Sequence, residues 1–419
     1  MRVTAAFNRL LALPGTTVRE VSFEPARISV TVALRRRRLV CADCQYSTKA
    51  RYDTRTVDST WRHLDLGRLR LVVQARLRRL ACPAHGVRTE GVPFARVESG
   101  STRDFEDLVA WLATRMDKSA VRRLVRVAWQ TVGAICQRVV VDRLDHRRLD
   151  ELFEIGVDEV AWRKGHRYLT LVTDHRSGKV AWGAEGKDTA TLDRFFAELG
   201  TDRAAKLAAV STDMGPAFLK SVTTKAPNAT VCIDPFHVVK LATDALDQVR
   251  RQVWNQLRTV DPAQARRFKG ARWVLLKRPD RLTSEQAATL RRLRRHGGAA
   301  WRAYALKESL REVFAGDLTP SETTQLLDRW CAKASRSRLA PFVTLAGTIR
   351  KHRHGILAAI RLGVNNARVE ALNNKVRLIT RRAYGFHSAQ AALALVMLAC
   401  GPITLRLPHE QTHVRPHSG

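Results

Sequence analysis

The spacing of apolar residues divides the first third of the chain into two kinds of segment. Residues 68–79 alternate apolar and mostly basic side chains, and this period of two predicts a β-strand with one apolar and one basic face. Between residues 104 and 140, apolar positions recur at helical spacing in three short blocks, the last opening near Ala128. Three short helices with tight joints are typical of a helix-turn-helix unit.

From Glu154 the pattern becomes that of an α/β fold. Short apolar runs and short polar linkers predict strand, strand, strand, helix, strand, helix and strand in that order. Asp158 lies in the first of these strands, and Asp213 ends the fourth. In a ribonuclease-H-like sheet those two strands are neighbours, so the two carboxylates would meet across one strand spacing and could hold a divalent metal. Asp174 and Asp188 are more simply interpreted as turn-capping residues.

The charge of the chain indicates the class of its partner. Lys and Arg number 73 against 39 acids, which gives a net charge of +34 and a pI near 11.2. Because such a charge repels itself, a polyanionic partner is expected, and basic residues in every segment favour nucleic acid over a membrane. The longest apolar run, residues 391–400, is too short to cross a bilayer, and the first residues lack the apolar core of a secretory signal. We therefore expect a cytoplasmic protein that associates with nucleic acid.

The cysteines fall into two groups. The sequences CADC and CPAH supply Cys41, Cys44, Cys82 and His85, two pairs with the spacing of a zinc knuckle, which together predict one tetrahedral Cys3His zinc site. The alternative is a set of reduced thiols without metal. The remaining cysteines stand singly in apolar surroundings and are interpreted as small buried residues: Cys136, Cys232, Cys331 and Cys400.

Basic and polar side chains near the zinc pairs are candidate DNA contacts. The basic face of residues 68–79 would contact phosphates, and the outer face of the third helix would read bases, although a solvated surface explains the basic face equally simply. The candidates are Arg68, Arg70, Arg76, Arg78, Gln130, Thr131, Gln137 and Arg138.

Residues from about 240 to 363 show helical periodicity throughout and predict an all-helical insertion into the α/β fold. Its tryptophans are interpreted as core residues, although one of them could instead stack on a flipped DNA base. They are Trp254, Trp273, Trp301 and Trp330.

Between Arg329 and His409 the chain has a single acid, Glu370. A helix in this region would place Glu370 on one face with Asn374, Arg377 and Arg381. Either the helix is solvated and its Glu pairs with Arg, or a metal-binding carboxylate stands beside cations that bind a polyanion.

Four segments, taken in order, resemble the transposases of the ISL3 insertion-sequence family. They are GVDEVAWRKGHRYLTLVTD at 156–174, VSTDMGPAF at 210–218, CIDPFHVVKL at 232–241 and NNARVEALNNKVRLITRRAYGF at 365–386. The zinc pairs, the helix-turn-helix and the order of the segments also match, so the resemblance covers nearly the entire chain. His85 stands where a fourth Cys is expected in such relatives.

The resemblance implies a DDE-type transposase in which Asp158, Asp213 and Glu370 bind Mg²⁺ or Mn²⁺. Two such ions would activate water or a DNA 3′-hydroxyl for strand cleavage and strand transfer. Asp234 and His237 lie in an equally recognisable motif and are possible accessory residues, but Asp213 is preferred because it follows the fourth strand. Phosphates near the scissile bond would be contacted by Asn373, Asn374, Lys375, Arg377 and Arg381.

The predicted organisation has six parts. They are a zinc-binding β-rich domain at 1–98, a helix-turn-helix at 100–148, a ribonuclease-H-like core at 150–245, an all-helical insertion at 246–362, the last core helices with Glu370 at 363–402, and a tail at 403–419. The expected partners are double-stranded DNA, as transposon ends and target, and further copies of the chain in a homodimer or higher oligomer. The main alternative is a DNA-binding regulator whose catalytic site has decayed; a nuclease on the same fold would need no sequence-specific reader.

Overall fold

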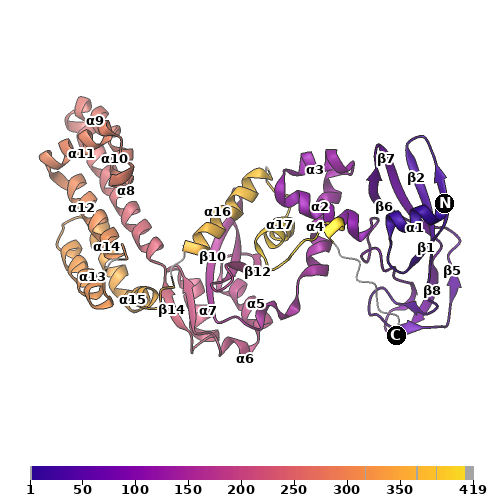
Figure 1. Ribbon diagram of the computed structural model, residues 1–419. Helices are drawn as coiled ribbons and strands as arrows, with labels where there is room; N and C mark the ends of the chain where they lie inside the picture. Colours follow the sequence, from indigo (N-terminus) through magenta and orange to yellow (C-terminus); the bar gives the residue numbers. More distant parts are fainter. Residues whose placement is uncertain (1, 317, 365–366, 384, 411–419) are drawn as a thin grey trace. The chain divides into compact units, whose positions relative to one another are not determined.

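The computed structural model describes residues 2–316, 318–364, 367–383 and 385–410, and of residues 367–370 it describes only the backbone. The chain forms two compact units, Met1–His146 with Val376–Gly419, and Arg147–Lys375. Figure 1 shows the elements coloured along the sequence. Among the described helices no single one is long and apolar enough to cross a membrane, and one bent pair, Lys118–Val125 with Trp129–Arg143, qualifies only by joint length and composition.

The first unit begins with helix α1 and several small β-sheets. After α1 (Val3–Leu11), a four-stranded sheet has the order β1 (Thr16–Phe23), β2 (Arg27–Leu34), β7 (Leu69–Ala75), β6 (Ser59–Leu66). A three-stranded sheet has the order β5 (Asp53–Thr54), β8 (Arg78–Cys82), β9 (Gly86–Thr89), and β3 (Leu39–Val40) pairs with β4 (Ser47–Thr48). The larger sheet buries Ile28, Val30, Leu71 and Val73 against Phe94.

The prediction of a single strand over residues 68–79 is wrong, because this segment contributes to two strands in different sheets. In β7 the buried positions are Leu71, Val73 and Ala75, and the alternation continues to Leu77. The next fully buried side chain is Leu80, three residues later, so the buried face changes register. The chain leaves the first sheet at this point and enters the second as β8.

The helix-turn-helix region has the three predicted helices. They are α2 (Arg103–Arg115), α3 (Lys118–Val125) and α4 (Trp129–Arg143), with Ala128 as the N-cap of α4. Side chains of Thr102 and Asp117 cap α2 and α3 by accepting backbone N–H groups. The apolar helix α17 (Ala389–Cys400) packs against α2 and α4. This packing groups α17 with the helix-turn-helix, whereas the predicted domain boundaries grouped it with the catalytic core.

The second unit contains a five-stranded mixed sheet. Its strands are β10 (Glu154–Arg163), β11 (Arg167–Asp174), β12 (Lys179–Glu185), β13 (Ala209–Thr212) and β14 (Thr230–Ile233). The order is β12-β11-β10-β13-β14, antiparallel from β12 to β10 and parallel from β10 to β14. The first and fourth strands are therefore neighbours, as predicted. Helices α5 (Thr189–Leu199), α6 (Thr201–Ala204) and α7 (Pro216–Lys225) belong to the same compact unit as this sheet.

A run of helices follows the sheet, as the periodicity predicted. They are α8 (Pro235–Val260), α9 (Pro262–Lys269), α10 (Arg272–Leu276), α11 (Ser284–His296), α12 (Gly298–Val313), α13 (Pro320–Ser335), α14 (Ala340–Lys351) and α15 (Arg353–Arg361). They share a core that includes Leu246, Leu310, Leu327 and Phe342. Helix α16 (Ala367–Arg382) comes next in the chain, before α17, and carries Glu370.

Gly355 marks the point where α15 approaches β14 most closely. A Cβ atom on Gly355 would lie 2.9 Å from Ile233 Cγ1 and 3.1 Å from the Val231 carbonyl oxygen. We therefore expect Gly355→Ala to lower the free energy of unfolding by about 1–3 kcal/mol through overpacking. Urea unfolding measures the change, with Gly347→Ala as the matched control. Gly347 is exposed in α14 with no atom within 4 Å of such a Cβ, and its replacement should stabilise by about 0.5–1 kcal/mol. Equal effects of the two substitutions would contradict the packing described here.

Candidate functional site

Three aspartates stand level with one another across β10, β13 and β14: Asp158 lies within β10, and Asp213 and Asp234 directly follow β13 and β14. The register of β10 with β13, continued by two residues, places Asp158 beside Asp213. The register of β13 with β14, continued by one residue, places Asp213 beside Asp234. Parallel strands therefore bring these carboxylates to one edge of the sheet although they lie far apart in sequence.

Asp158 is held by two hydrogen bonds from different elements. The backbone N–H of Glu159 donates to Asp158 Oδ1 at 2.7 Å, and the buried Asn373 donates from Nδ2 to Asp158 Oδ2. Asn373 lies in α16, so this helix meets β10 at the first predicted catalytic carboxylate. Glu370 lies one helical turn earlier in α16, and its side chain is outside the described residues. The sequence predicts Asn373 as a phosphate contact and does not predict its bond to Asp158.

Burial and neighbouring carboxylates raise the affinity of Asp158 and Glu159 for protons. Burial raises the pKa of Asp158, and the nearby charge of Asp213 raises it further. Burial also raises the pKa of Glu159, with Asp213 and Asp158 acting in the same direction. His237 opposes the shift at Asp158, and Lys187 opposes it at Glu159. A partly buried group of like charges is stabilised by a bound cation.

Glu159 is a member of this group that the sequence analysis did not single out. It follows Asp158 directly in the GVDE motif, but strand alternation would place consecutive side chains on opposite faces. Its electrostatic coupling to both Asp158 and Asp213 shows that it nevertheless shares their field. In the sequence, only the position of Glu159 in the GVDE motif, next to Asp158, could have indicated that it belongs to this group.

Asp213 is fixed by the turn that follows β13. Its Oδ1 accepts a hydrogen bond from the Gly215 backbone N–H at 2.9 Å, and α7 begins at the next residue, Pro216. A Cβ atom on Gly215 would lie 2.8 Å from the same carboxylate oxygen. The turn therefore leaves no room for a side chain beside the carboxylate.

Gly215→Ala is expected to displace the Asp213 carboxylate while leaving the backbone intact. The φ of Gly215 is −64°, which Ala adopts without strain, so the added methyl acts mainly on the neighbouring side chain. We expect strand cleavage to fall by about tenfold or more, since a misplacement of about 1 Å in a catalytic site costs up to about a hundredfold. Cleavage rates and thermal unfolding are compared with wild type. Unchanged cleavage would contradict a role for Asp213 at this position.

Asp234 has a structural role that Asp213 lacks. It is buried, serves as the N-cap of α8 and accepts a hydrogen bond from the Phe236 N–H at 3.0 Å. Its Oδ2 lies 3.7 Å from His237 Nε2. Asp213 also accepts one backbone N–H, so hydrogen bonding does not distinguish the two carboxylates. Asp213 is favoured as the second metal ligand because it follows β13, the strand next to β10, whereas Asp234 follows β14, one strand further away.

The donor set at this edge fits a hard divalent cation. Carboxylate oxygens are the ligands that Mg²⁺ and Mn²⁺ prefer, and the field of Asp158, Asp213 and Glu159 favours a positive ion. Within the described side chains, these acids form no compact group of three ligand atoms. The predicted third ligand, Glu370, falls outside those side chains.

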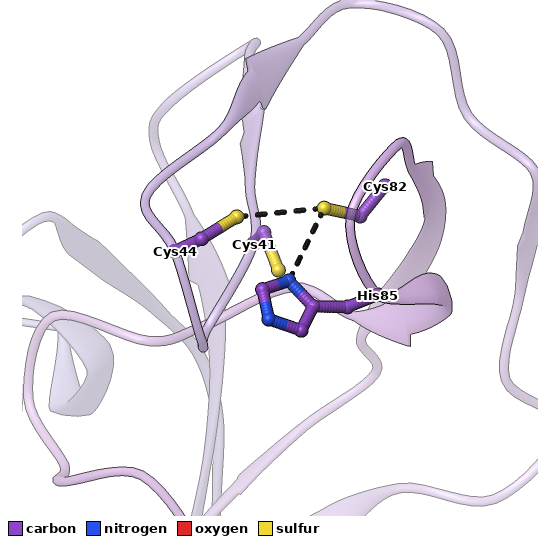
Figure 2. A group of neighbouring side chains, drawn as sticks. All are labelled: Cys41, Cys44, Cys82 and His85. Atoms are coloured by element: carbon purple, nitrogen blue, oxygen red, sulfur yellow. Dashed lines mark hydrogen bonds between the residues drawn. The ribbon is translucent and has the colours of Figure 1, made fainter.

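The four predicted zinc ligands come together in the first unit. Ligand atoms of Cys41, Cys44, Cys82 and His85 all lie within 4.8 Å of one another (Figure 2). Cys44 Sγ is 3.4 Å from Cys82 Sγ, which is 3.5 Å from His85 Nδ1. Desolvation raises the pKa of the Cys82 thiol, but the contacts with His85 and Cys44 lower it more, to about 6. Three sulfur atoms and one ring nitrogen in this arrangement fit a tetrahedral zinc ion.

Comparison with known proteins decides the family. A family model described as a transposase matches residues 155–395, more than half of the chain. A second, described as the helix-turn-helix domain of transposase family ISL3, matches residues 90–140. The chain belongs to the ISL3 family of transposases.

Individual relatives agree with this membership. The transposase for insertion sequence element IS1557 of Mycobacterium tuberculosis is 41% identical over 447 aligned positions, covering 99% of both chains. The transposase for insertion sequence element IS1001 of Bordetella parapertussis is 30% identical, covering 84% of this chain and 86% of the relative. The alignment with the first relative thus spans the segments that carry the Cys and His cluster, the helix-turn-helix and the sheet of this ISL3 family member.

Some candidate DNA contacts in the first unit are exposed, whereas others form ion pairs within the protein. Arg68, Arg70 and Gln130 are exposed. Arg78 instead forms an ion pair with the buried Glu90 at 2.7 Å, and Arg138 forms one with the buried Glu106 at 2.6 Å. Removing either guanidinium would leave a buried carboxylate without that partner, so both arginines have structural roles irrespective of DNA.

The basic residues predicted along α16 lie on its exposed side. Asn374, Lys375, Arg377 and Arg381 are exposed, whereas Asn373 is buried against Asp158. The helix therefore has one side that supports the carboxylate site and another that presents amide and cationic groups to solvent. Sequence periodicity could not distinguish the roles of the neighbouring Asn373 and Asn374.

Proposed function

We propose that the protein binds the ends of its insertion sequence and catalyses metal-dependent cleavage and transfer of DNA strands. In this proposal the five-stranded sheet is a ribonuclease-H-like core, and Asp158, Asp213 and Glu370 are a DDE triad. The observation that supports it best is the meeting of β10, β13 and α16, with Asn373 of α16 bonded to Asp158. Family membership supports the same chemistry.

Each residue of the site would have a distinct task. Asp158 and Asp213 would bind the metal ions, with Asn373 orienting the first carboxylate and the Gly215 N–H orienting the second. Glu370 would add a third carboxylate from α16. Bound Mg²⁺ or Mn²⁺ ions would activate the attacking hydroxyl group and stabilise the leaving oxygen.

The exposed cations of α16 would hold the scissile strand. Lys375, Arg377 and Arg381 are solvent-exposed on the helix whose buried Asn373 contacts the carboxylate site. Phosphate contacts of this kind position DNA without reading its sequence. The cations would also offset the repulsion between the DNA and the carboxylates.

The zinc site would be structural. Its four ligands would close the tetrahedral coordination sphere, which leaves no position for a reacting group. Zinc would thus support the β-rich part of the first unit, and Mg²⁺ or Mn²⁺ would serve the chemistry of the second. We further propose that the protein acts on DNA as a homodimer or higher oligomer, because two element ends must be joined to one target.

Sequence recognition would come from α4. Gln130 is exposed in the first turn of this helix, where recognition helices contact base edges. We expect Gln130→Ala to weaken binding to the element's end by roughly 5- to 150-fold, the value of about 1–3 kcal/mol for a good base contact. Binding to unrelated duplex should be unchanged. Fluorescence anisotropy measures both, with Gln256→Ala, exposed in α8, as control. Equal losses on both duplexes would contradict a reading role.

The proposed function is tested by incubating the purified chain with DNA that carries the element's two ends. With Mg²⁺ or Mn²⁺ we expect strand breaks at the element ends and joined products, and with EDTA neither. Specific binding with no cleavage under either metal would instead favour the alternative of a DNA-binding regulator with a decayed site.

A further inference from the structure

Trp273 departs from the interpretation of the tryptophans as core residues. Trp330 is buried and donates from Nε1 to the Leu306 carbonyl oxygen at 2.8 Å. Trp254 and Trp301 are partly buried against the helical core. Trp273, in α10, has 59% of its surface exposed. A large aromatic ring left in solvent forgoes a substantial hydrophobic stabilisation, and such exposure is typical of a binding surface.

A pocket lies beside Trp273. It has a volume of about 700 Å³ and is lined by residues from the end of α8, from α9, from α10 and from α11, elements that Figure 1 shows at one end of the helical segment. Phe268 and Leu293 contribute apolar wall, and Gln264, Gln286 and Thr289 contribute polar groups. A concave, partly apolar site with a few polar groups is the usual form of a small-ligand pocket.

Cations line the pocket, and more of them lie nearby in sequence. Arg267, Arg292 and His296 line it, and the Arg272 guanidinium carbon lies 5.1 Å from the centroid of the Trp273 ring. The last turns of α9 and α11 add further basic residues, Arg266, Lys269, Arg294 and Arg295. Within the described part of the chain, no ion pair joins any of these groups to a carboxylate, although Arg250 and Arg251 of the neighbouring α8 are both paired with Asp247. Glu285 is the one acid of the lining.

We propose that this pocket binds an unpaired nucleotide of DNA. The flat base would stack on Trp273, and the phosphates on either side would be held by Arg267 and Arg292. An exposed aromatic ring among unpaired cations is the combination that binds single-stranded nucleic acid, because stacking accepts any base and the cations follow the backbone. A nucleotide satisfies both features, whereas an apolar protein partner would leave the cations uncompensated. The inference rests on the proposed function only in taking DNA as the substrate.

The first test measures affinity with the full-length protein. A fluorescein-labelled single-stranded oligonucleotide of about 12 nucleotides and mixed sequence is titrated by anisotropy. We expect Trp273→Ala to weaken this binding by roughly 5- to 150-fold, the usual effect of removing one stacking aromatic. Trp273→Phe should recover most of the affinity. The affinity of both variants for a duplex that carries the element's end should equal that of wild type, which also shows that they are folded.

Charge variants separate stacking from general attraction to DNA. Arg267→Ala is compared with Arg281→Ala, which removes the same charge from an exposed position outside the pocket lining. Arg267→Ala should weaken single-strand binding more than Arg281→Ala does. Equal effects would show that the pocket adds nothing to the overall charge and would overturn the proposal.

The second test locates the base. An oligonucleotide with 5-iodouracil in place of thymine is irradiated in complex with the full-length protein, and the crosslinked peptide is identified by mass spectrometry. We expect the crosslink at Trp273; a crosslink confined to other residues, or unchanged single-strand affinity of Trp273→Ala, would overturn the inference. A change of oligomeric state in Trp273→Ala, with single-strand affinity unchanged, would show a protein interface instead. Failure of the proposed function is a different result, namely wild-type protein that does not bind the element's duplex ends.

Discussion

Replacing Asp158 or Asp213 by Ala is expected to lower strand cleavage and joining by several orders of magnitude while DNA binding survives. Each substitution removes a carboxylate from a site where metal ions stabilise the transition state, and each loss of 1.36 kcal/mol is a tenfold loss in rate. In the proposed function these side chains bind metal and not bases, so affinity for the element's ends should stay the same or rise slightly as repulsion between carboxylates and phosphates is relieved. Gel assays of nicked and joined products measure the chemistry, and anisotropy measures the binding.

Asp234→Ala is the matched control for this experiment. Because Asp234 caps α8, its loss should lower stability by about 0.5–2 kcal/mol and affect cleavage less than Asp213→Ala does. If Asp234→Ala abolished cleavage and Asp213→Ala cleaved normally, the second metal ligand would be Asp234. Glu370→Ala cleaving at the wild-type rate would remove Glu370 from the proposed triad.

Cys41→Ser is expected to lose zinc and to reduce the yield of folded protein severely. The apolar cluster around the site consists of Leu39, Cys41, Leu80 and Cys82, so two of its four buried members are themselves proposed ligands. So small a core cannot hold two distant segments together without the metal, and zinc binding in such sites contributes about 10–16 kcal/mol to folding. Elemental analysis should give one zinc per chain in wild type and none in the variant.

Ala42→Ser controls for the introduction of a hydroxyl group in the same turn. It leaves all four ligands in place and should keep wild-type zinc content and yield. Full zinc occupancy in Cys41→Ser would contradict the assignment of Cys41 as a ligand. Chelation of wild-type protein should reproduce the effect of Cys41→Ser if the metal is structural.

Local patterns explain what could be predicted from the sequence. The zinc ligands come as two pairs with fixed spacing, so each half of the site is set within four residues and only the meeting of the halves is tertiary. The order of strands β10 to β14 follows from short apolar runs with clear turns. The helices α2 to α4 follow from the helical spacing of their apolar residues.

Features that depend on tertiary contacts could not be predicted in the same way. Asn373 and Asn374 are equivalent in sequence, and only the packing of α16 on β10 selects Asn373 as the partner of Asp158. The sequence predicts that Arg138 lies on an exposed face of its helix, but in the structure Arg138 forms an ion pair with the buried Glu106 of α2. Trp273 has the spacing of a core residue, but the short helix α10 buries Val274 and Leu275 instead and leaves Trp273 exposed.

The most direct test of the metal site is the activity of Asp213→Cys with two metal ions. A thiolate is a poor ligand for Mg²⁺ and a better one for softer ions, so the variant should be inactive with Mg²⁺ and regain cleavage with Mn²⁺. Wild-type protein should cleave the element's ends with both ions, and Asp213→Ala with neither. Recovery by Mn²⁺ in Asp213→Cys alone is the predicted result. Cleavage by Asp213→Cys at the wild-type rate with Mg²⁺ would contradict the assignment of Asp213 as a ligand of the catalytic metal.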